Sequence, residues 1–492
     1  MGAIFAGIPA PASAQLPTLG DGSELSTGAE RRLGEKIARE LYRDPDYIDD
    51  PVLAEYVQAI WEPLLAAARL RGEVTPELDE RFAWQILLGK DRTINAFALP
   101  GGYLGLQLGL VAVVANRDEL ASVLAHELSH VTQRHISRLM TQQNRQTPWV
   151  IGAMILGAIA ASKNPDAGNA VIAGGQALAI QNQLNFSRDM EREADRIGYG
   201  VMTQAGFEPL GFVTMFDKLQ QASRLNENGS FPYLRTHPMT TERMADMQAR
   251  QQLAGRSVTP TPPTLQHAMV VARARVLSSP GVDGLRALAT EAQVPGWPSL
   301  SPARQAGSLY AAALASLKLR DAAAARRFAL QLQDLVKQDV AASRLARLLV
   351  AEIALDAGDA AGAAALLPAV SAGRPDLLLR AQAETRGGHP ERATSALQTW
   401  TALHPRDATA WQLLAGAYAA QGQPVRAIRA EAEAQVAHLD YAAAMDRFKA
   451  AQELVRQKAR TGTLGEDHIE ASIIDTRTRQ VESLLREQAL ER

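Results

Sequence analysis

The sequence NRDELASVLAHELSHVTQRHISRLM, residues 116–140, contains the motif HELSH at residues 126–130 and has the apolar spacing of one long helix. Histidines four residues apart lie about 40° apart around a helix, so His126 and His130 can bind one metal ion from the same face. Glu127 lies beside them, where it can take a proton from an attacking water. Zinc suits such a site, and three protein ligands leave its fourth position open for catalysis.

A carboxylate is expected as the third ligand, on the helical segment NFSRDMEREADRIGYGVM at residues 185–202. Glu191 and Asp195 are four residues apart and share one helix face, whereas Glu193 points roughly the other way. Two acids on one face repel each other unless a cation or a histidine N–H separates them. We therefore expect Glu191 to bind zinc and Asp195 to accept from the free nitrogen of a ligating histidine. The alternative is an exposed acidic helix with interleaved arginine ion pairs.

Four blocks, HELSHVTQRH, INAFALPGGYLGLQLGLV, SRDMEREADRIG and THPMTTERMADM, together resemble the BepA-like periplasmic zinc metalloproteases. These are gluzincin relatives of HtpX and of the CAAX prenyl-protease peptidases. The blocks follow the family's order, and the likeness covers roughly the first half of the chain. It implies a zincin-type metalloprotease with one zinc ion per chain, in which His126, His130 and Glu191 are the ligands and Glu127 is the general base.

His237 and Arg243 lie in the last of these blocks, where relatives also have a histidine and an arginine. His237 could donate to the tetrahedral intermediate, occupy the open zinc position and hold the enzyme latent, or be only structural; we favour the latent state, gated by loop movement. Arg243 is either a cation near the cleft or a partner for the ligand helix. His135, nine residues after His126, falls on the opposite face of a continuous helix and is left out of the predicted metal site.

Apolar residues recur at helical spacing over residues 28–44 and 51–70, which we expect to wrap the catalytic core. Strand-like runs at residues 81–89, 93–101 and 103–110, separated by polar or Pro-Gly-Gly breaks, predict a small antiparallel sheet.

An edge of that sheet beside the metal could hold an extended peptide by main-chain pairing. Asn95, Ala96 and Phe97 are the candidates for lining this substrate site. The alternative is that Phe97 belongs to the core and Asn95 to a turn.

The apolar run from Pro148 to Ala161 is too short for a membrane span, which needs about 20 residues. It is expected to form a buried helical hairpin or an apolar surface near the cleft that touches unfolded or membrane-bound clients. No transmembrane span is predicted. An apolar surface near the cleft would be compatible with peripheral membrane contact.

Composition excludes some kinds of site, and the N-terminal residues indicate where the protein is located. The net charge of 51 − 53 = −2 gives no reason to expect a nucleic-acid partner. The chain has no cysteine, which excludes disulfides, a cysteine nucleophile and the acylated cysteine of a lipoprotein. Residues 1–14 end in Ala12-Ser13-Ala14, an A-x-A cleavage pattern that indicates a truncated signal peptide and export, although the basic start of such a peptide is missing. The alternative is a plain disordered leader.

A second domain is expected after the Pro- and Thr-rich linker near residue 260. GGHPERA at residues 387–393 recurs as QGQPVRA at 421–427, a shift of 34 residues, which is the tetratricopeptide period. Stacked helix pairs of this kind form a solenoid that binds peptide or protein, although a structural cap over the protease is also possible. The residues that fit the repeat spacing are Trp411, Leu414, Tyr418, Gly422 and Ala427.

These patterns predict a mainly α protein with a small antiparallel β-sheet, in which a metalloprotease domain (15–258) precedes a tetratricopeptide solenoid (259–492). What the resemblance implies is a periplasmic zinc endopeptidase that degrades misfolded or stalled outer-membrane β-barrel proteins and assists their assembly, with the repeats contacting the β-barrel assembly machinery. The rival hypothesis is a chaperone or assembly adaptor in which the repeats bind clients and the zinc site is latent.

Overall fold

A computed structural model of the protein describes residues 25–142, 187–224, 232–253, 259–279, 281–462 and 467–489. The predicted leader (1–14) and the apolar run Pro148–Ala161 lie outside these ranges. No helix within the described ranges is long and apolar enough to cross a membrane.

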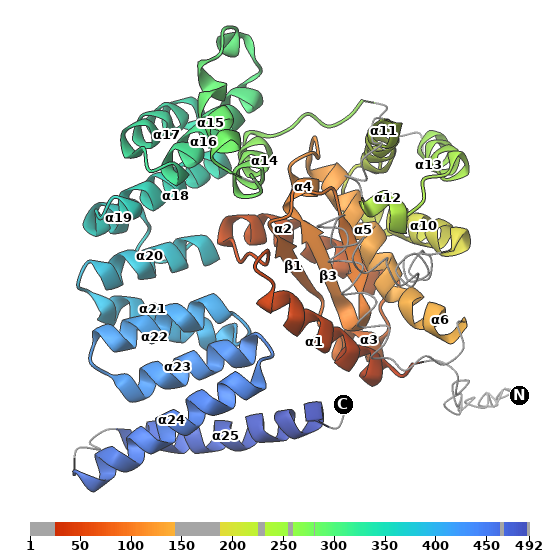
Figure 1. The fold of residues 1–492 in the computed structure, drawn as a ribbon. Helices are drawn as coiled ribbons and strands as arrows, with labels where there is room; N and C mark the ends of the chain where they lie inside the picture. Colours follow the sequence, from red (N-terminus) through yellow and green to blue (C-terminus); the bar gives the residue numbers. More distant parts are fainter. Residues whose placement is uncertain are drawn as a thin grey trace, which may run out of the picture.

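The first half consists of helices packed around a small sheet (Figure 1). Its elements are α1 (Thr27–Arg43), α2 (Pro51–Leu70), α3 (Pro76–Arg81), β1 (Gln85–Gly89), β2 (Ala96–Leu99), η1 (Pro100–Gly102), β3 (Tyr103–Gln107), α4 (Leu108–Val111), α5 (Arg117–Thr132), α6 (His135–Gln142), α10 (Arg188–Gln204), α11 (Leu210–Arg224), α12 (Pro232–Thr236) and α13 (Thr241–Leu253).

The sheet is mixed, so the prediction of an antiparallel sheet is wrong for one of its two pairings. Its strand order is β1-β3-β2: β2 and β3 form an antiparallel hairpin, whereas β1 pairs with β3 in parallel. The hairpin turn is Pro-Gly-Gly, and Gly101 and Gly102 have φ of +70° and +83°, a backbone conformation that favours glycine. The connection over residues 90–95 is long enough to leave room for β3 between β1 and β2, and the spacing of strand-like runs does not reveal this insertion.

The motif-bearing helix is interrupted, which also differs from the prediction of one helix over residues 116–140. Helix α5 begins after Asn116, whose side chain accepts from the N–H groups of Asp118 and Glu119, and ends at Thr132. Arg134 then has φ of +51°, in the left-handed region, and α6 begins at His135. Because of this break, the side chains after Thr132 point in other directions than they would on a continuous helix.

Two glycines let the neighbouring helices approach α5. A Cβ at Gly198 of α10 would lie 3.1 Å from the Ala125 backbone, and one at Gly211 of α11 would lie 2.4 Å from the Asp118 carbonyl oxygen. Larger side chains at these positions would push both helices outward. The close approach of α10 brings its acidic residues to the histidines of α5.

The described residues of the second half form helices joined by turns and short loops. Its elements are α14 (Leu265–Leu277), α15 (Val282–Thr290), η2 (Glu291–Gln293), η3 (Trp297–Ser299), α16 (Pro302–Lys318), α17 (Ala322–Val336), α18 (Val340–Asp356), α19 (Ala360–Leu366), α20 (Arg374–Arg386), α21 (Pro390–Leu403), α22 (Ala408–Ala420), α23 (Pro424–Ala437), α24 (Tyr441–Arg460) and α25 (Asp467–Ala489).

The 34-residue sequence shift corresponds to two successive helix pairs, α20–α21 and α22–α23. Their turns contain Gly388 and Gly422, with φ of +82° and +67°. Trp411, Leu414 and Tyr418 are buried together in the cluster that joins these pairs. Figure 1 shows the pairs following one another beside the first half. Assignment of the pairs to the tetratricopeptide class stays a prediction.

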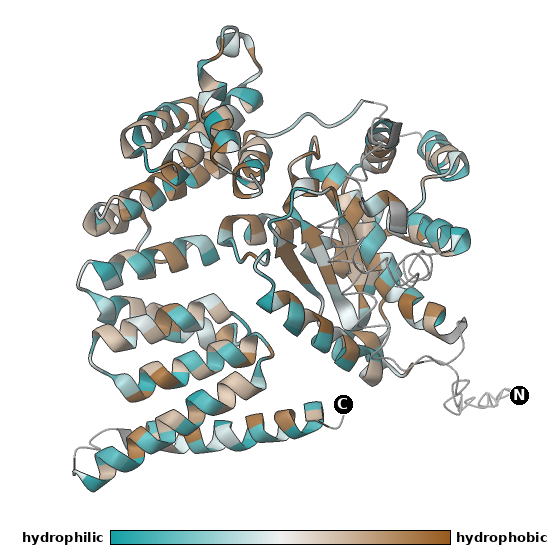
Figure 2. Cartoon of the chain, viewed as in Figure 1, coloured by the Kyte–Doolittle hydropathy of each residue, from teal (hydrophilic) through white to brown (hydrophobic). Residues whose placement is uncertain are grey.

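The two halves share one hydrophobic core and are joined by ion pairs at its edge. The core continues from α2 and α5 into α14, α16, α17 and α18, and Figure 2 shows hydrophobic ribbon over the sheet and the inner helices while α10 and α13 are largely hydrophilic. Arg374 of α20 contacts Asp49 at 2.5 Å and Asp407 at 2.7 Å. Further along, Arg43 contacts Asp440 at 2.8 Å. The linker near residue 260 is therefore not a break in packing.

Candidate metal centre

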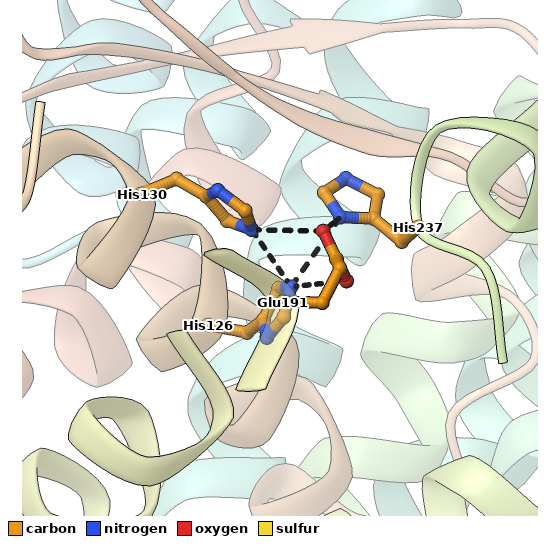
Figure 3. Close-up of side chains that lie close together, drawn as sticks. All are labelled: His126, His130, Glu191 and His237. Atoms are coloured by element: carbon orange, nitrogen blue, oxygen red, sulfur yellow. Dashed lines mark hydrogen bonds and ion pairs between the residues drawn. The ribbon is translucent and has the colours of Figure 1, made fainter. Parts of the chain in front are cut away.

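Four side chains from three separate parts of the first half meet at one buried point (Figure 3). Nε2 of His126 lies 3.0 Å from Nε2 of His130 and 3.3 Å from Nδ1 of His237. The Glu191 carboxylate completes the group, with oxygens 3.5 Å from His126 Nε2, 3.4 Å from His130 Nε2 and 3.0 Å from His237 Nδ1. Each of the four residues is at most 1% exposed. Among the described residues, this is the one group of histidine and acidic side chains that could hold a metal ion.

These separations fit a zinc ion. Ligand atoms about 2.0–2.1 Å from a tetrahedral zinc lie about 3.4 Å from one another, close to the distances above. Glu127 supplies a second indication. It is fully buried, neither of its carboxylate oxygens accepts a hydrogen bond from a described residue, and Oε1 lies 3.5 Å from Nε2 of His237. A buried carboxylate without hydrogen bonds is costly unless a ligand or cation occupies the space beside it. The donor set and this unsatisfied acid therefore match a zinc centre.

Asp195 and Arg243 contact two of the candidate ligands from behind. Asp195 is one turn after Glu191 on α10, and its Oδ1 lies 2.9 Å from Nδ1 of His126. The Arg243 guanidinium contacts Asp195 through Nε at 2.6 Å and Nη2 at 2.8 Å, and contacts Glu191 through Nη1 at 2.7 Å. Arg243 is 2% exposed, so it lies behind the ligands rather than in an open cleft. One arginine thus links both carboxylates of α10.

The surrounding charges favour a cation at this point. Burial raises the pKa of Glu191, but the nearby His237 and the hydrogen bonds from the histidines outweigh it and hold that pKa well below 4.5. Burial lowers the pKa of His126, but its contacts with Asp195 and Glu191 outweigh that effect and raise it to about 10. Burial dominates at His130, whose pKa lies well below 6.5. The ionised Glu191 and the neutral His130 match the protonation states of zinc ligands, whereas His126 would release its proton when the metal binds.

The sequence-based reasoning missed two side chains that contact the ligand rings. His135 is fully buried, and its Nδ1 lies 2.9 Å from Nδ1 of His130. A continuous helix would place His135 on the face opposite His126, but the break at Arg134 turns it towards His130. The second is Tyr233, whose ring stacks on His237 at 4.5 Å. The spacing Tyr-x-x-x-His, one helical turn, was the available signal for Tyr233.

The residues predicted to line a substrate strand lie outside the metal-binding group. Asn95 and Ala96 are buried next to α12, since the Tyr233 N–H contacts the carbonyl of Ile94 at 3.4 Å. Ala96 belongs to the core that includes α5, whereas Phe97 points to the other face of the sheet, onto Gly105 and the cluster beneath α1. Strand β2 is an edge strand.

Comparison with known proteins matches residues 51–251 to Peptidase family M48. The chain is 31% identical over 438 residues to the beta-barrel assembly-enhancing protease of Escherichia coli, covering 87% of this chain and 85% of that protein. A Vibrio cholerae relative described as a putative beta-barrel assembly-enhancing protease is 37% identical over 238 residues, about half of each chain (48% and 47%). The mitochondrial metalloendopeptidase OMA1 of Saccharomyces cerevisiae is 28% identical over 196 residues, 39% of this chain and 54% of that protein.

Proposed function

Because this chain belongs to Peptidase family M48, in the group of the beta-barrel assembly-enhancing proteases, we propose that it degrades misfolded or stalled outer-membrane β-barrel proteins in the periplasm and assists their assembly. The enzyme class itself follows from the family: the protein is a zinc metalloendopeptidase. The periplasmic location, the signal peptide and the clients are parts of the proposal.

The observation that carries the catalytic proposal is the position of Glu127. His126, His130 and Glu191 would hold the metal, and zinc bound there supplies a Lewis acid that lowers the pKa of water to about 7. Glu127 follows His126 directly and is free of hydrogen bonds from the residues that the structure describes. It can therefore take the proton from the attacking water and deliver it to the leaving amine.

For His237 we keep the gating role. Its Nδ1 lies among the ligand atoms, and four protein ligands give the closed coordination typical of structural zinc sites, whereas catalytic sites keep one position open. Hydrolysis would then require α12 and the loop after it to move His237 away. The short contact between the Tyr233 ring and His237 supports such a movement as one unit. A role in stabilising the tetrahedral intermediate is the alternative.

Binding of clients is proposed for two elements. Edge strand β2, with Asn95, Ala96 and Phe97, would pair with an extended peptide through its backbone, which gives broad sequence tolerance. The helix pairs of residues 259–492 would bind client segments or the β-barrel assembly machinery, while residues 15–258 form the protease domain. The match to the protease family over residues 51–251, inside that domain, supports this division.

Digestion of an unfolded outer-membrane β-barrel protein by the purified full chain tests the proposal. We expect wild type to cleave it, and Glu127→Gln to retain one zinc per chain while losing about 10²–10⁴-fold in rate, because the proton transfer is lost. Casein serves as a second substrate. If wild type and Glu127→Gln support barrel assembly equally and neither cleaves the client, the adaptor hypothesis replaces the protease hypothesis. The observation that favours the adaptor hypothesis is the group of four candidate ligands, which would leave no open position on the zinc.

A further inference from the structure

We propose that His135 and Glu193 are positioning residues that determine which nitrogen of His130 carries its proton, and thereby direct the other nitrogen to the metal. The inference rests on the assignment of His130 as a zinc ligand. It concerns two residues that no part of the catalytic proposal uses.

The carboxylate of Glu193 sets the direction of the hydrogen bonds that run from His130 through His135 to Glu193. Oε2 of Glu193 lies 3.1 Å from Nε2 of His135, and an ionised carboxylate can only accept, so Nε2 of His135 donates. Nδ1 of a neutral His135 then has a lone pair and accepts from Nδ1–H of His130 at 2.9 Å. Nε2 of His130 consequently has no proton, and its lone pair faces the metal position.

The charge states that this derivation needs agree with the surroundings. His130 can bind zinc through Nε2 only when that nitrogen has no proton, so Nδ1 of His130 donates and a neutral His135 accepts. Glu193 accepts a hydrogen bond from Nη1 of Arg138 at 2.8 Å as well as the one from His135, and the arginine charge stabilises its ionised form. Glu193 is therefore an ionised acceptor.

The helix break explains why His135 can reach His130. The left-handed residue Arg134 separates the two helices, and its Nε donates to Glu30 of α1 at 2.9 Å. This contact fixes the turn and places His135 under the ligand ring rather than on the opposite side of α5. In the same way, Glu191 and Glu193 of α10 divide their roles: one lies among the ligand atoms, and the other contacts His135.

The two ligand histidines of α5 thus have different hydrogen-bond partners at Nδ1. Nδ1 of His126 faces the carboxylate of Asp195, which is paired with Arg243, whereas Nδ1 of His130 faces a neutral imidazole. Partners of this kind fix ligand orientation, and their loss typically reduces metal affinity about 10–100-fold.

The test measures Zn²⁺ affinity of the full chain by competition with a chromophoric chelator. His135→Phe keeps a ring but removes the acceptor, and we expect about 10–100-fold weaker binding. His135→Gln restores an acceptor and should recover most of that loss. Glu193→Ala should weaken binding by a smaller factor, and adding it to His135→Phe should cost nothing further, because Glu193 acts through His135. Asp189→Ala, an exposed acid on the same helix, should bind zinc like wild type.

A second readout follows the proton directly. In nitrogen-15 histidine spectra of the zinc-loaded protein, His130 should be the Nδ1–H tautomer in wild type, and His135→Phe should lose that fixed form. Wild-type zinc affinity in His135→Phe or additive losses in the double variant would overturn the proposal. If His135→Phe does not fold, wild-type affinity in Glu193→Ala overturns it instead. If His130→Ala bound zinc at wild-type affinity, the assignment of His130 as a ligand would be wrong. This result distinguishes a failure of the ligand assignment from a failure of the positioning proposal.

Discussion

The Arg243 guanidinium forms two hydrogen bonds with the Asp195 carboxylate, at 2.6 and 2.8 Å, and this pair lies directly behind the ligand ring of His126. Both residues are almost fully buried. A buried pair of this kind is costly to break from one side, because the remaining charge stays buried without its partner.

Asp195→Asn should therefore reduce both zinc affinity and stability. We expect about 10–100-fold weaker zinc binding, since the carboxylate beside His126 is lost, and about 3–5 kcal/mol less stability of the zinc-free protein, since Arg243 loses its charge partner. Chelator competition and thermal unfolding measure the two effects. Asp189→Asn, whose carboxylate pairs with Arg192 at the surface, is the matched control. Unchanged zinc affinity in Asp195→Asn would contradict the role of Asp195 in positioning His126.

Glu191→Ala should abolish stoichiometric zinc binding. The side chain supplies the negative ligand of the group, and its loss leaves three histidines without a charge to balance the cation. Elemental analysis of purified protein should fall from about one zinc per chain to a small fraction. Glu208→Ala, an exposed acid beyond α10, should keep the metal. One zinc per chain in Glu191→Ala would contradict the ligand assignment.

His237→Ala separates the two roles proposed for that residue. Gating predicts that zinc is retained and that proteolysis rises severalfold, because the fourth coordination position is open. Stabilisation of the tetrahedral intermediate predicts the opposite, a fall in kcat of about 10²-fold or more. Casein digestion with zinc analysis of the same samples distinguishes them. The Tyr233→Leu variant, which loses the ring stacked on His237, should change activity in the same direction under gating.

The pair of Asp407 with Arg374, an arginine that also contacts Asp49 of the first half, gives the stability a dependence on pH. Burial raises the pKa of Asp407, but the hydrogen bonds from Arg374 outweigh it and hold it below 3.8. The stabilisation is thus fully present above pH 3.8 and is lost as the pH falls through the folded-state pKa. Asp407→Asn, which keeps the cap of α22, should cost about 2 kcal/mol at pH 7, and the difference should shrink below pH 3.8. Urea unfolding of zinc-free protein measures this.

The exposed pair Lys337–Asp334 provides the control for that experiment. Asp334→Asn should change stability by less than about 0.5 kcal/mol at every pH, because surface ion pairs contribute little. A difference between Asp407→Asn and wild type that stays constant down to pH 2.5 would show that the charge of Asp407 is not the source of the stabilisation.

The sequence predicted the parts of this protein that depend on local spacing. His126 and His130 come together because of helical periodicity, and Glu191 and Asp195 share a face for the same reason. The 34-residue shift likewise became two helix pairs with left-handed glycines at equivalent turns.

Features set by distant contacts were not predicted. The parallel pairing of β1 with β3 depends on which strand occupies the middle of the sheet, and no local pattern specifies that. The left-handed Arg134, held by Glu30 from α1, interrupts a segment whose apolar spacing continues without a break. The relation of His135 to His130 was missed for this reason.

The contact between Arg43 and Asp440 also bears on how the protein is made. The two residues are 397 positions apart, and next to them the ring of Tyr42 stacks on His438 at 4.8 Å. A ribosome has to complete nearly the whole chain before this contact can form. A premature stop before residue 438 would therefore leave the aromatic end of α1 uncovered, and nonsense mutations late in the gene should produce a protease half that is itself prone to aggregate.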